Sequence, residues 1–246
     1  GGFFIYDGTV KKLPCLVEDF VFQTTGTNLG INRDAGEQIY GVHNSLFSEI
    51  SWFYPKNGSD AVDRIVTYNY AERTWVTGSL ARTSAADASI YDKPYMTKFT
   101  ENVAPTYPTV NGISTSQGAT TYYEHETGVN EVDFAGNKTA ISAYIQSGDF
   151  DLDVEGDGEF FIKVRRFIPD YKVLTGNSKV TLDLRDYPNQ TASSSSLGPF
   201  TVTSSTNKVD TRARARLAAL KIENDAVDEN WRLGLFRFDI QPDGRR

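Results

Sequence analysis

Three arginines near the C-terminal end of the chain alternate with small or apolar residues. Because side chains alternate between the two faces of a β-strand, Arg212, Arg214 and Arg216 would share one face. A guanidinium group binds carboxylates and phosphates through paired hydrogen bonds. The row therefore predicts a subunit interface built from salt bridges. The alternatives are a solvated face and a contact with the phosphates of DNA.

Six carboxylates alternate along residues 149–159, whose sequence is DFDLDVEGDGE. A calcium-binding EF-hand loop has a glycine at its sixth position and a glutamate at its twelfth. Starting at Asp149 or at Asp151, the twelfth position is apolar instead, Phe160 or Ile162. The run therefore predicts a hairpin with carboxylates facing water and no bound metal, and an irregular cation site is the alternative.

Groups for acid–base or nucleophilic catalysis are scarce. The chain has two histidines, His43 and His125. On a strand, Glu124 and Glu126 would share one face while His125 points away, which opposes a direct Glu–His relay. The single cysteine, Cys15, excludes a disulfide within the chain. We expect no catalytic residues, no cofactor and no metal.

Strands would position all of these groups. Aromatic residues are abundant, and long segments with helical periodicity are missing. Residues 39–80 predict four short strands, at 39–42, 47–54, 64–70 and 75–80. Four consecutive antiparallel strands of this length are typical of one β-propeller blade. Trp52, Tyr68 and Trp75 are expected to be buried in its core.

The fold class predicted for the whole chain is all-β, a β-propeller blade region followed by a β-sandwich-like domain. The boundary is placed between residues 138 and 139, giving domains 1–138 and 139–246. One blade cannot close a propeller, so we expect the blade region to belong to a larger propeller completed by a longer chain or by other subunits. Residues 101–118 are expected to be an exposed insertion. The remaining strands are predicted at 3–6, 94–99, 119–126, 141–146, 159–167, 179–185, 199–203, 212–222 and 231–240.

Charge is distributed unevenly along the chain. The net charge is −7. Residues 1–138 contain 10 basic and 16 acidic residues, whereas residues 139–246 contain 15 and 16. An acidic surface repels phosphate, which disfavours tight nonspecific binding of DNA. No apolar run is long enough to span a bilayer, so membrane insertion is not expected.

Several stretches together resemble the tail nozzle proteins of short-tailed bacteriophages, a family also described as packaged-DNA stabilisation proteins. They occur in the order of that family and cover most of the chain from residue 39 onward. The stretches are EISWFYP (49–55), YNYAERTWVTGSLART (68–83), YYEHETG (122–128), IQSGDFDLDVEGDGEFFIKVRRFIPDY (145–171) and RARARLAALKIENDAVDENWRLGLFRFDIQPDGRR (212–246).

The resemblance implies a virion structural protein located in the tail. Its subunits would form a homo-oligomeric ring, usually a hexamer, below the portal and the tail adaptor. Double-stranded DNA would pass through the lumen without sequence-specific contact, along a wall that is net negative. The resemblance implies no catalytic residues. On this view Arg214→Ala would lower ring or tail assembly with little effect on folding of the subunit.

Two alternative functions stay open. One is a carbohydrate-binding or depolymerising virion propeller, in which exposed aromatic side chains stack on sugar rings. Burial of Trp52, Trp75 and Trp231 in the core would count against it. The other is a propeller-type interaction module outside any virus.

Overall fold

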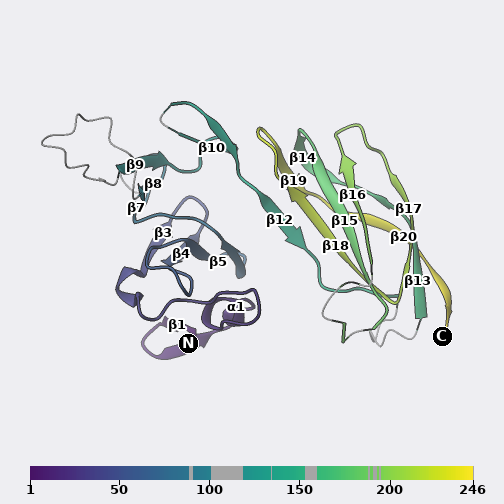
Figure 1. Cartoon of the computed structure of the whole chain (residues 1–246), viewed down its shortest axis with the longest axis horizontal. Helices are drawn as coiled ribbons and strands as arrows, with labels where there is room; N and C mark the ends of the chain where they lie inside the picture. Colours follow the sequence, from purple (N-terminus) through teal and green to yellow (C-terminus); the bar gives the residue numbers. More distant parts are fainter. Residues whose placement is uncertain are drawn as a thin grey trace, which may run out of the picture. The chain divides into compact units, whose positions relative to one another are not determined.

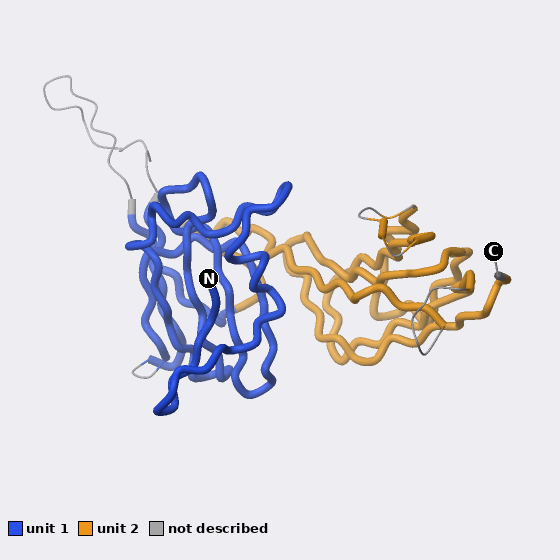
Figure 2. The backbone as a smooth tube through the Cα atoms, turned by 90° about the horizontal axis from the view of Figure 1, so that it is seen from below, with its two compact units in different colours: residues 1–127 blue, residues 128–246 orange. Residues whose placement is uncertain are grey.

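The computed structural model describes residues 1–88, 91–100, 119–133, 135–152, 160–187, 189–190, 193 and 195–245. The chain forms two compact units, Gly1–Thr127 and Gly128–Arg246 (Figure 2). The predicted boundary lay 11 residues further on, after residue 138. The hairpin of β10 (Asn130–Val132) and β11 (Lys138–Ala140) thus belongs to the second unit. Its residues Asn130 and Lys138 both bind Asp228 there, at 2.6 and 2.8 Å.

Both units are built almost entirely from antiparallel strands (Figure 1), as the all-β prediction required. Helical structure in the described residues is limited to a five-residue α-helix and one 3₁₀ turn, and neither is long enough to cross a membrane. The elements of unit 1 are β1 (Phe3–Tyr6), β2 (Val10–Leu13), α1 (Glu18–Phe22), η1 (Gly36–Gln38), β3 (Tyr40–Asn44), β4 (Glu49–Tyr54), β5 (Arg64–Asn69), β6 (Thr74–Gly78), β7 (Ser84–Ala86), β8 (Tyr95–Thr100) and β9 (Ala119–Glu124).

The predicted four-stranded unit is confirmed as the sheet β3-β4-β5-β6. Each strand pairs antiparallel with the next along the chain, with Trp52 opposite Val66 and Tyr68 opposite Trp75. The strand boundaries lie within two residues of those predicted. Aromatic and β-branched residues bounded by turn residues were therefore a sufficient signal here.

Both faces of this sheet are covered. On one face, Tyr54 and Val66 pack with Phe3 of β1 and Val21 of α1. On the other, Phe53 is fully buried with Val62 and Met96. The alternation along β4 therefore directs successive residues into two separate cores.

The large aromatic residues of the four-stranded sheet are mostly buried, as predicted. Trp52, Tyr68 and Trp75 each keep only a minority of their surface exposed, and both tryptophans pack against the core that contains Phe3. The ring of Phe3 lies 4.9 Å from that of Trp52 and 4.6 Å from that of Trp75. Both tryptophans therefore contribute to the core on this face of the sheet.

The sheet β7-β8-β9 continues the antiparallel pattern of unit 1. Met96 on β8 is 8% exposed and packs in the same core as Phe53 of β4. Two sheets that follow each other in the chain thus share one hydrophobic core. Strand β7 was not predicted, because its three residues, Ser84–Ala86, are small and carry no strand signal.

Unit 2 contains the strands expected of the second domain and others that were not predicted. Besides the β10–β11 hairpin, its strands are β12 (Ala143–Gln146), β13 (Phe160–Ile168), β14 (Tyr171–Thr175), β15 (Ser178–Arg185), β16 (Ser195–Val202), β17 (Val209–Ala215), β18 (Leu217–Asn224), β19 (Asn230–Leu233) and β20 (Arg237–Arg245). They form the sheets β12-β18-β15-β16 and β17-β13-β20, and the two-stranded sheets β14-β19 and β10-β11.

The two larger sheets of unit 2 share a core. Ile162 and Val164 of β13 pack with Leu182 and Leu184 of β15, which belongs to the other sheet. Burial alternates strictly along β15, where every second residue from Ser178 is buried. Two antiparallel sheets facing each other across shared apolar side chains are what a sandwich requires.

Two strands predicted as continuous are each divided. Residues 212–222 form the end of β17 and most of β18, which belong to different sheets. The chain changes sheet at Arg216, so the prediction of a single strand there was wrong. Residues 231–240 likewise divide into β19 and β20. Apolar periodicity continues through both breaks, because each strand contributes to a core on either side of the break.

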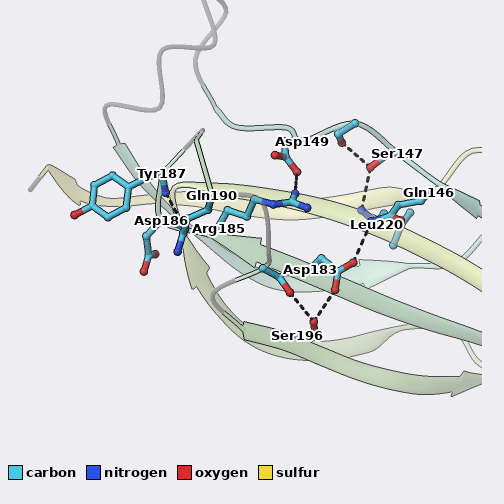
Figure 3. Close-up of polar contacts among 12 residues, drawn as sticks. Gln146, Ser147, Asp149, Asp183, Arg185, Asp186, Tyr187, Gln190, Ser196 and Leu220 are labelled. Carbon is cyan, nitrogen blue, oxygen red and sulfur yellow. Dashed lines mark hydrogen bonds and ion pairs between the residues drawn. The ribbon is translucent and has the colours of Figure 1, made fainter. Parts of the chain in front are cut away.

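The start of the acidic run is held against the sandwich (Figure 3). Asp149 pairs with Arg185, and Phe150 exchanges backbone hydrogen bonds with Ala218 at 2.8 and 3.0 Å. Asp149 is therefore fixed by an ion pair within the unit, where a water-facing hairpin had been predicted. The rest of that predicted hairpin, residues 153–159, lies outside the described residues, as does the predicted insertion at 101–118.

Candidate functional site

The outer face of the sheet β17-β13-β20 carries many charged side chains, and we call it the basic face. It lies opposite the side of the sheet that contributes to the core. Among the side chains that the structure describes, its cations outnumber its carboxylates by more than two to one. Its charged residues are Lys163, Arg165, Arg166, Arg212, Arg214, Arg216 and Arg237, together with Asp210, Asp239 and Asp243.

The row of arginines that the sequence singled out lies on this face. Along β17 the buried residues are Thr211, Ala213 and Ala215, whereas Arg212 and Arg214 are exposed. Arg216 follows directly at the change of sheet and is partly buried. Alternation of small and charged residues therefore predicted the common face of the row, while the bend at its end was not foreseen.

A β-bulge in the neighbouring strand β13 adds cations that the sequence analysis did not single out. The register of β13 against both β17 and β20 shifts between Val164 and Arg166. Val164 and Phe167 are fully buried, and both residues between them are more exposed. Because β13 has one extra residue here relative to β20, Arg165 and Arg166 both reach the outer face. The signal in the sequence was the pair of consecutive arginines between two buried apolar residues.

Carboxylates of the same unit neutralise part of the face. The Arg214 Nε atom lies 2.6 Å from Asp243 Oδ2. The Arg166 Nε atom lies 3.3 Å from an oxygen of Asp210 and 3.6 Å from one of Asp239. These pairs link β17, β13 and β20 across the sheet. Asp243 already supplies the partner that the sequence-based prediction sought for Arg214 in a neighbouring subunit.

Aromatic rings hold two guanidinium groups of the row. The guanidinium carbons of Arg214 and Arg216 lie 4.1 and 4.8 Å from the ring centre of Phe161. Arg216 also lies 6.0 Å from the ring centre of Tyr187. A cation over an aromatic face is attracted by the ring quadrupole. Phe161 therefore reduces the cost of placing two arginines close together.

Other cations of the face have no such partner. Among the described residues, no ion pair is formed by Lys163, Arg165 or Arg212. Lys163 lies directly opposite Arg214 in the ladder between β13 and β17. Like charges directly opposite each other are destabilising. Asp243 offsets the charge of Arg214, so a bound anion would chiefly neutralise Lys163, Arg165 and Arg212.

A shallow hollow of about 430 Å³ lies over these cations. It is lined by five basic side chains and two carboxylates, Asp210 and Asp243. An anion that entered the hollow would meet several cations at once. The basic residues of the lining are Lys163, Arg165, Arg166, Arg212 and Arg214.

The other residues with possible chemistry do not assemble into a site. His43 lies 3.2 Å from Asp87, and His125 accepts a hydrogen bond from Arg82 Nε at 3.0 Å. Glu126 lies beyond the end of β9 with φ of 59°, so it does not share a strand face with Glu124 as predicted. Within the described ranges no three histidine, cysteine or carboxylate groups gather as metal ligands.

A second hollow, lined by tyrosines, was missed by the sequence analysis. It has a volume of about 510 Å³ on the sheet β7-β8-β9 and is lined by Tyr91, Tyr95 and Tyr122 with small and hydroxyl side chains. Tyr122 is 76% exposed, and the rings of Tyr91 and Tyr95 meet edge to face at 5.1 Å. Tyr95 and Tyr122 share a face because they occupy alternate positions on paired strands, which could be recognised only once the pairing was known.

Comparison with known proteins does not identify the chain. No protein-family model matches it, and no curated protein is significantly similar to it. Its function must therefore be inferred from the arrangement of its residues and from the ordered resemblance described above.

Proposed function

We propose that the chain is a virion structural protein, a tail nozzle subunit of a short-tailed bacteriophage. Its subunits form a ring-shaped conduit that retains the packaged genome and then lets it pass. Support comes from the resemblance of five stretches of the sequence to tail nozzle proteins, in matching order. The role is structural, and no residue is assigned to catalysis.

The stacking of antiparallel units in unit 1 is the observation that carries the proposal. The hairpin β1–β2, the sheet β3-β4-β5-β6 and the sheet β7-β8-β9 follow one another in the chain. The first and second share the core of Phe3 and Tyr54, and the second and third share that of Phe53 and Met96. Successive antiparallel sheets that pack face to face are the repeating relation of propeller blades. This arrangement supports a propeller-containing subunit, which tail nozzle proteins possess.

In this proposal the ring is a homo-oligomer, with a hexamer as the expected state, and it joins the tail adaptor and other tail proteins. Its location is the virion tail. Double-stranded DNA passes through the lumen without sequence-specific contact. The acidic excess of residues 1–138 limits nonspecific adhesion of DNA, because like charges repel.

Electron microscopy of purified virions and of the purified protein tests this function. The expected result is a closed ring on the tail axis, and antibodies against the chain should label the tail tip. Particles lacking the protein should package DNA and then lose it. A protein that stays monomeric at high concentration and is absent from virions would overturn the proposal.

The tyrosine-lined hollow favours a second candidate, carbohydrate binding. Exposed aromatic rings beside hydroxyl groups suit an amphipathic ligand. The tryptophans give this candidate less support, since Trp52, Trp75 and Trp231 all pack against hydrophobic cores. Calorimetric titration with oligosaccharides from the surface of the host cell would decide it. Binding that is lost in Tyr122→Ala and retained in the exposed Tyr6→Ala control would establish the site.

A further inference from the structure

We propose that the basic face of unit 2 binds the phosphodiester backbone of double-stranded DNA. The inference rests on the proposed function for its choice of DNA as the source of phosphate. The basic face itself is defined by geometry alone. From the sequence, contact with DNA phosphates was only an alternative interpretation of Arg212, Arg214 and Arg216.

The first argument is the excess of positive charge in an acidic protein. The chain has a net charge of −7, yet the hollow on the basic face is lined by five cations and two carboxylates. Repulsion by the rest of the surface would direct a polyanion to this face.

The second argument is the lack of neutralisation at the centre of the face. Within the described part of the chain, Lys163, Arg165 and Arg212 make no ion pair. The register shift places Arg165 beside the 211–212 segment of β17, and Lys163 lies opposite Arg214, whose charge Asp243 already offsets. A phosphate between such neighbours would remove repulsion and add charge-assisted hydrogen bonds. A bound anion would therefore stabilise the face in two ways. It would reduce repulsion between the cations, and it would accept hydrogen bonds from them.

The third argument is the kind of cation and its spacing. Six of the seven basic side chains described on the face are arginines, whose planar forks match phosphate oxygens in pairs. Residues two apart on a strand are about 7 Å apart, so β17 and β13 present parallel rows of cations. A polymer with regularly spaced phosphates can meet several of them simultaneously, whereas a single carboxylate cannot. Such contacts fix position and carry no sequence information.

Anisotropy of a fluorescent DNA duplex of about 20 base pairs, titrated with the full chain, tests the inference. Affinity should be similar for unrelated sequences and should fall steeply between about 50 and 200 mM salt. The variant Lys163→Ala/Arg165→Ala/Arg212→Ala should bind at least about tenfold more weakly. It should also lower the slope of log K against log salt by about 3, one unit for each lost phosphate contact.

The matched control is Arg33→Ala/Lys172→Ala/Arg232→Ala, which removes three positive charges from exposed positions elsewhere. It should retain most of the affinity. If both triple variants lost the same affinity for DNA, the effect would be one of net charge and the inference would be overturned. Unchanged affinity in the Lys163→Ala/Arg165→Ala/Arg212→Ala variant would also overturn it. The single variant Arg212→Lys keeps the charge but loses the planar fork, so it should bind DNA less tightly than the parent and more tightly than Arg212→Ala. Thermal melting of each variant separates lost binding from lost folding.

Native mass spectrometry of the same variants distinguishes DNA binding by this face from binding of a second copy of the chain. It also distinguishes failure of this inference from failure of the proposed function. If the face instead binds the acidic surface of a second copy, the first triple variant will lose oligomers while its affinity for DNA stays the same, and the inference fails. Loss of DNA binding with intact rings supports it. Inorganic phosphate at matched ionic strength should not displace the duplex, and complete displacement would indicate a pocket for a single phosphate instead. A ring without DNA binding would refute only this inference, and DNA binding without a ring would refute only the nozzle assignment.

Discussion

The four-stranded sheet β3-β4-β5-β6 of unit 1 and the three-stranded sheet β17-β13-β20 of unit 2 differ in what lies on their second face. The first has hydrophobic cores on both faces, with Tyr54 on one and Phe53 on the other. The second has a core on one face and charged side chains on the other. The first sheet is thus an inner layer, suited to stacking against further sheets. The second is an outer layer, suited to meeting a charged partner.

Strand composition explains the difference. Strand β4 reads EISWFY, with large apolar residues at both odd and even positions. Strand β17 reads VDTRARA, in which small residues alternate with charged ones. Burial of apolar area on both faces gives β4 more stabilisation, whereas β17 leaves half its side chains in water. Mutations on the two sheets should therefore have effects of very different size.

The largest expected effect is that of Phe53→Ala. Phe53, on β4, is fully buried in the core that contains Met96, and its ring stacks on that of Tyr40 with the ring centres 4.9 Å apart. Truncation should lower the free energy of unfolding by about 3–5 kcal/mol, because it removes apolar contacts and leaves a cavity. Urea denaturation followed by tryptophan fluorescence measures it. The control Phe47→Ala, at a side chain that is 50% exposed, should cost far less. If both variants lost the same free energy of unfolding, burial on the second face of the sheet would contribute nothing to stability.

A pair of adjacent substitutions tests the one-sided character of β17. Ala213 is 1% exposed and faces the core, whereas its neighbour Arg212 faces out. Ala213→Leu should cost about 1–3 kcal/mol through overpacking. Arg212→Leu should change the free energy of unfolding by no more than about 0.5 kcal/mol. Comparison of the two by chemical denaturation checks the alternation directly. A reversed order would show that the strand faces the other way.

The sequence predicted those parts of the fold in which local pattern and tertiary environment agree. The strands of residues 39–80 were found because aromatic runs, turn residues and pairing all favour the same meander. The common face of Arg212 and Arg214 followed from period two alone. These features depend on neighbouring residues and need no knowledge of distant contacts.

The features that were missed depend on pairing between distant segments. The change of sheet at Arg216 is invisible in a continuous alternating pattern, since both β17 and β18 keep burying apolar residues. The bulge that exposes Arg165 and Arg166 is defined by register against two other strands. The partner of Arg214 is 29 residues away, at Asp243. The basic face as a whole could therefore not be assembled from the sequence, although one of its rows could.

Burial around the four-stranded sheet also changes the pKa of a carboxyl group, that of Glu49 at the start of β4. Burial, and then the nearby charge of Glu126, raise the pKa of Glu49 above its ordinary value. A raised pKa means that the folded state holds the proton more tightly. The corresponding stabilisation is fully present below the unfolded pKa of about 4.3 and is lost as pH rises through the folded value. Glu49→Gln should therefore be more stable than the parent at neutral pH.

The difference between Glu49→Gln and the parent should vanish below about pH 4. Thermal melting of both proteins from about pH 3 to pH 8 measures it. The exposed Glu72→Gln is the control for a change in net charge. A constant difference across the range would show that the amide acts by packing and not by removing a disfavoured charge.

The smallest expected effect is that of the ion pair between Arg214 and Asp243 on the basic face. The side chains of Arg214 and Asp243 are 50% and 41% exposed. Water screens such a pair, so its coupling energy should be about 0.2–1 kcal/mol. Arg214 also lies over the ring of Phe161, so Arg214→Ala alone removes two interactions.

A double-mutant cycle of Arg214→Ala and Asp243→Ala isolates the ion pair. Because the Debye length shrinks from about 10 Å at 0.1 M to about 3 Å at 1 M salt, the coupling should nearly disappear at the higher concentration. An ion pair shielded from water would instead show a coupling energy above about 2 kcal/mol that persists in 1 M salt. That result would mean that another copy of the chain covers the basic face in solution.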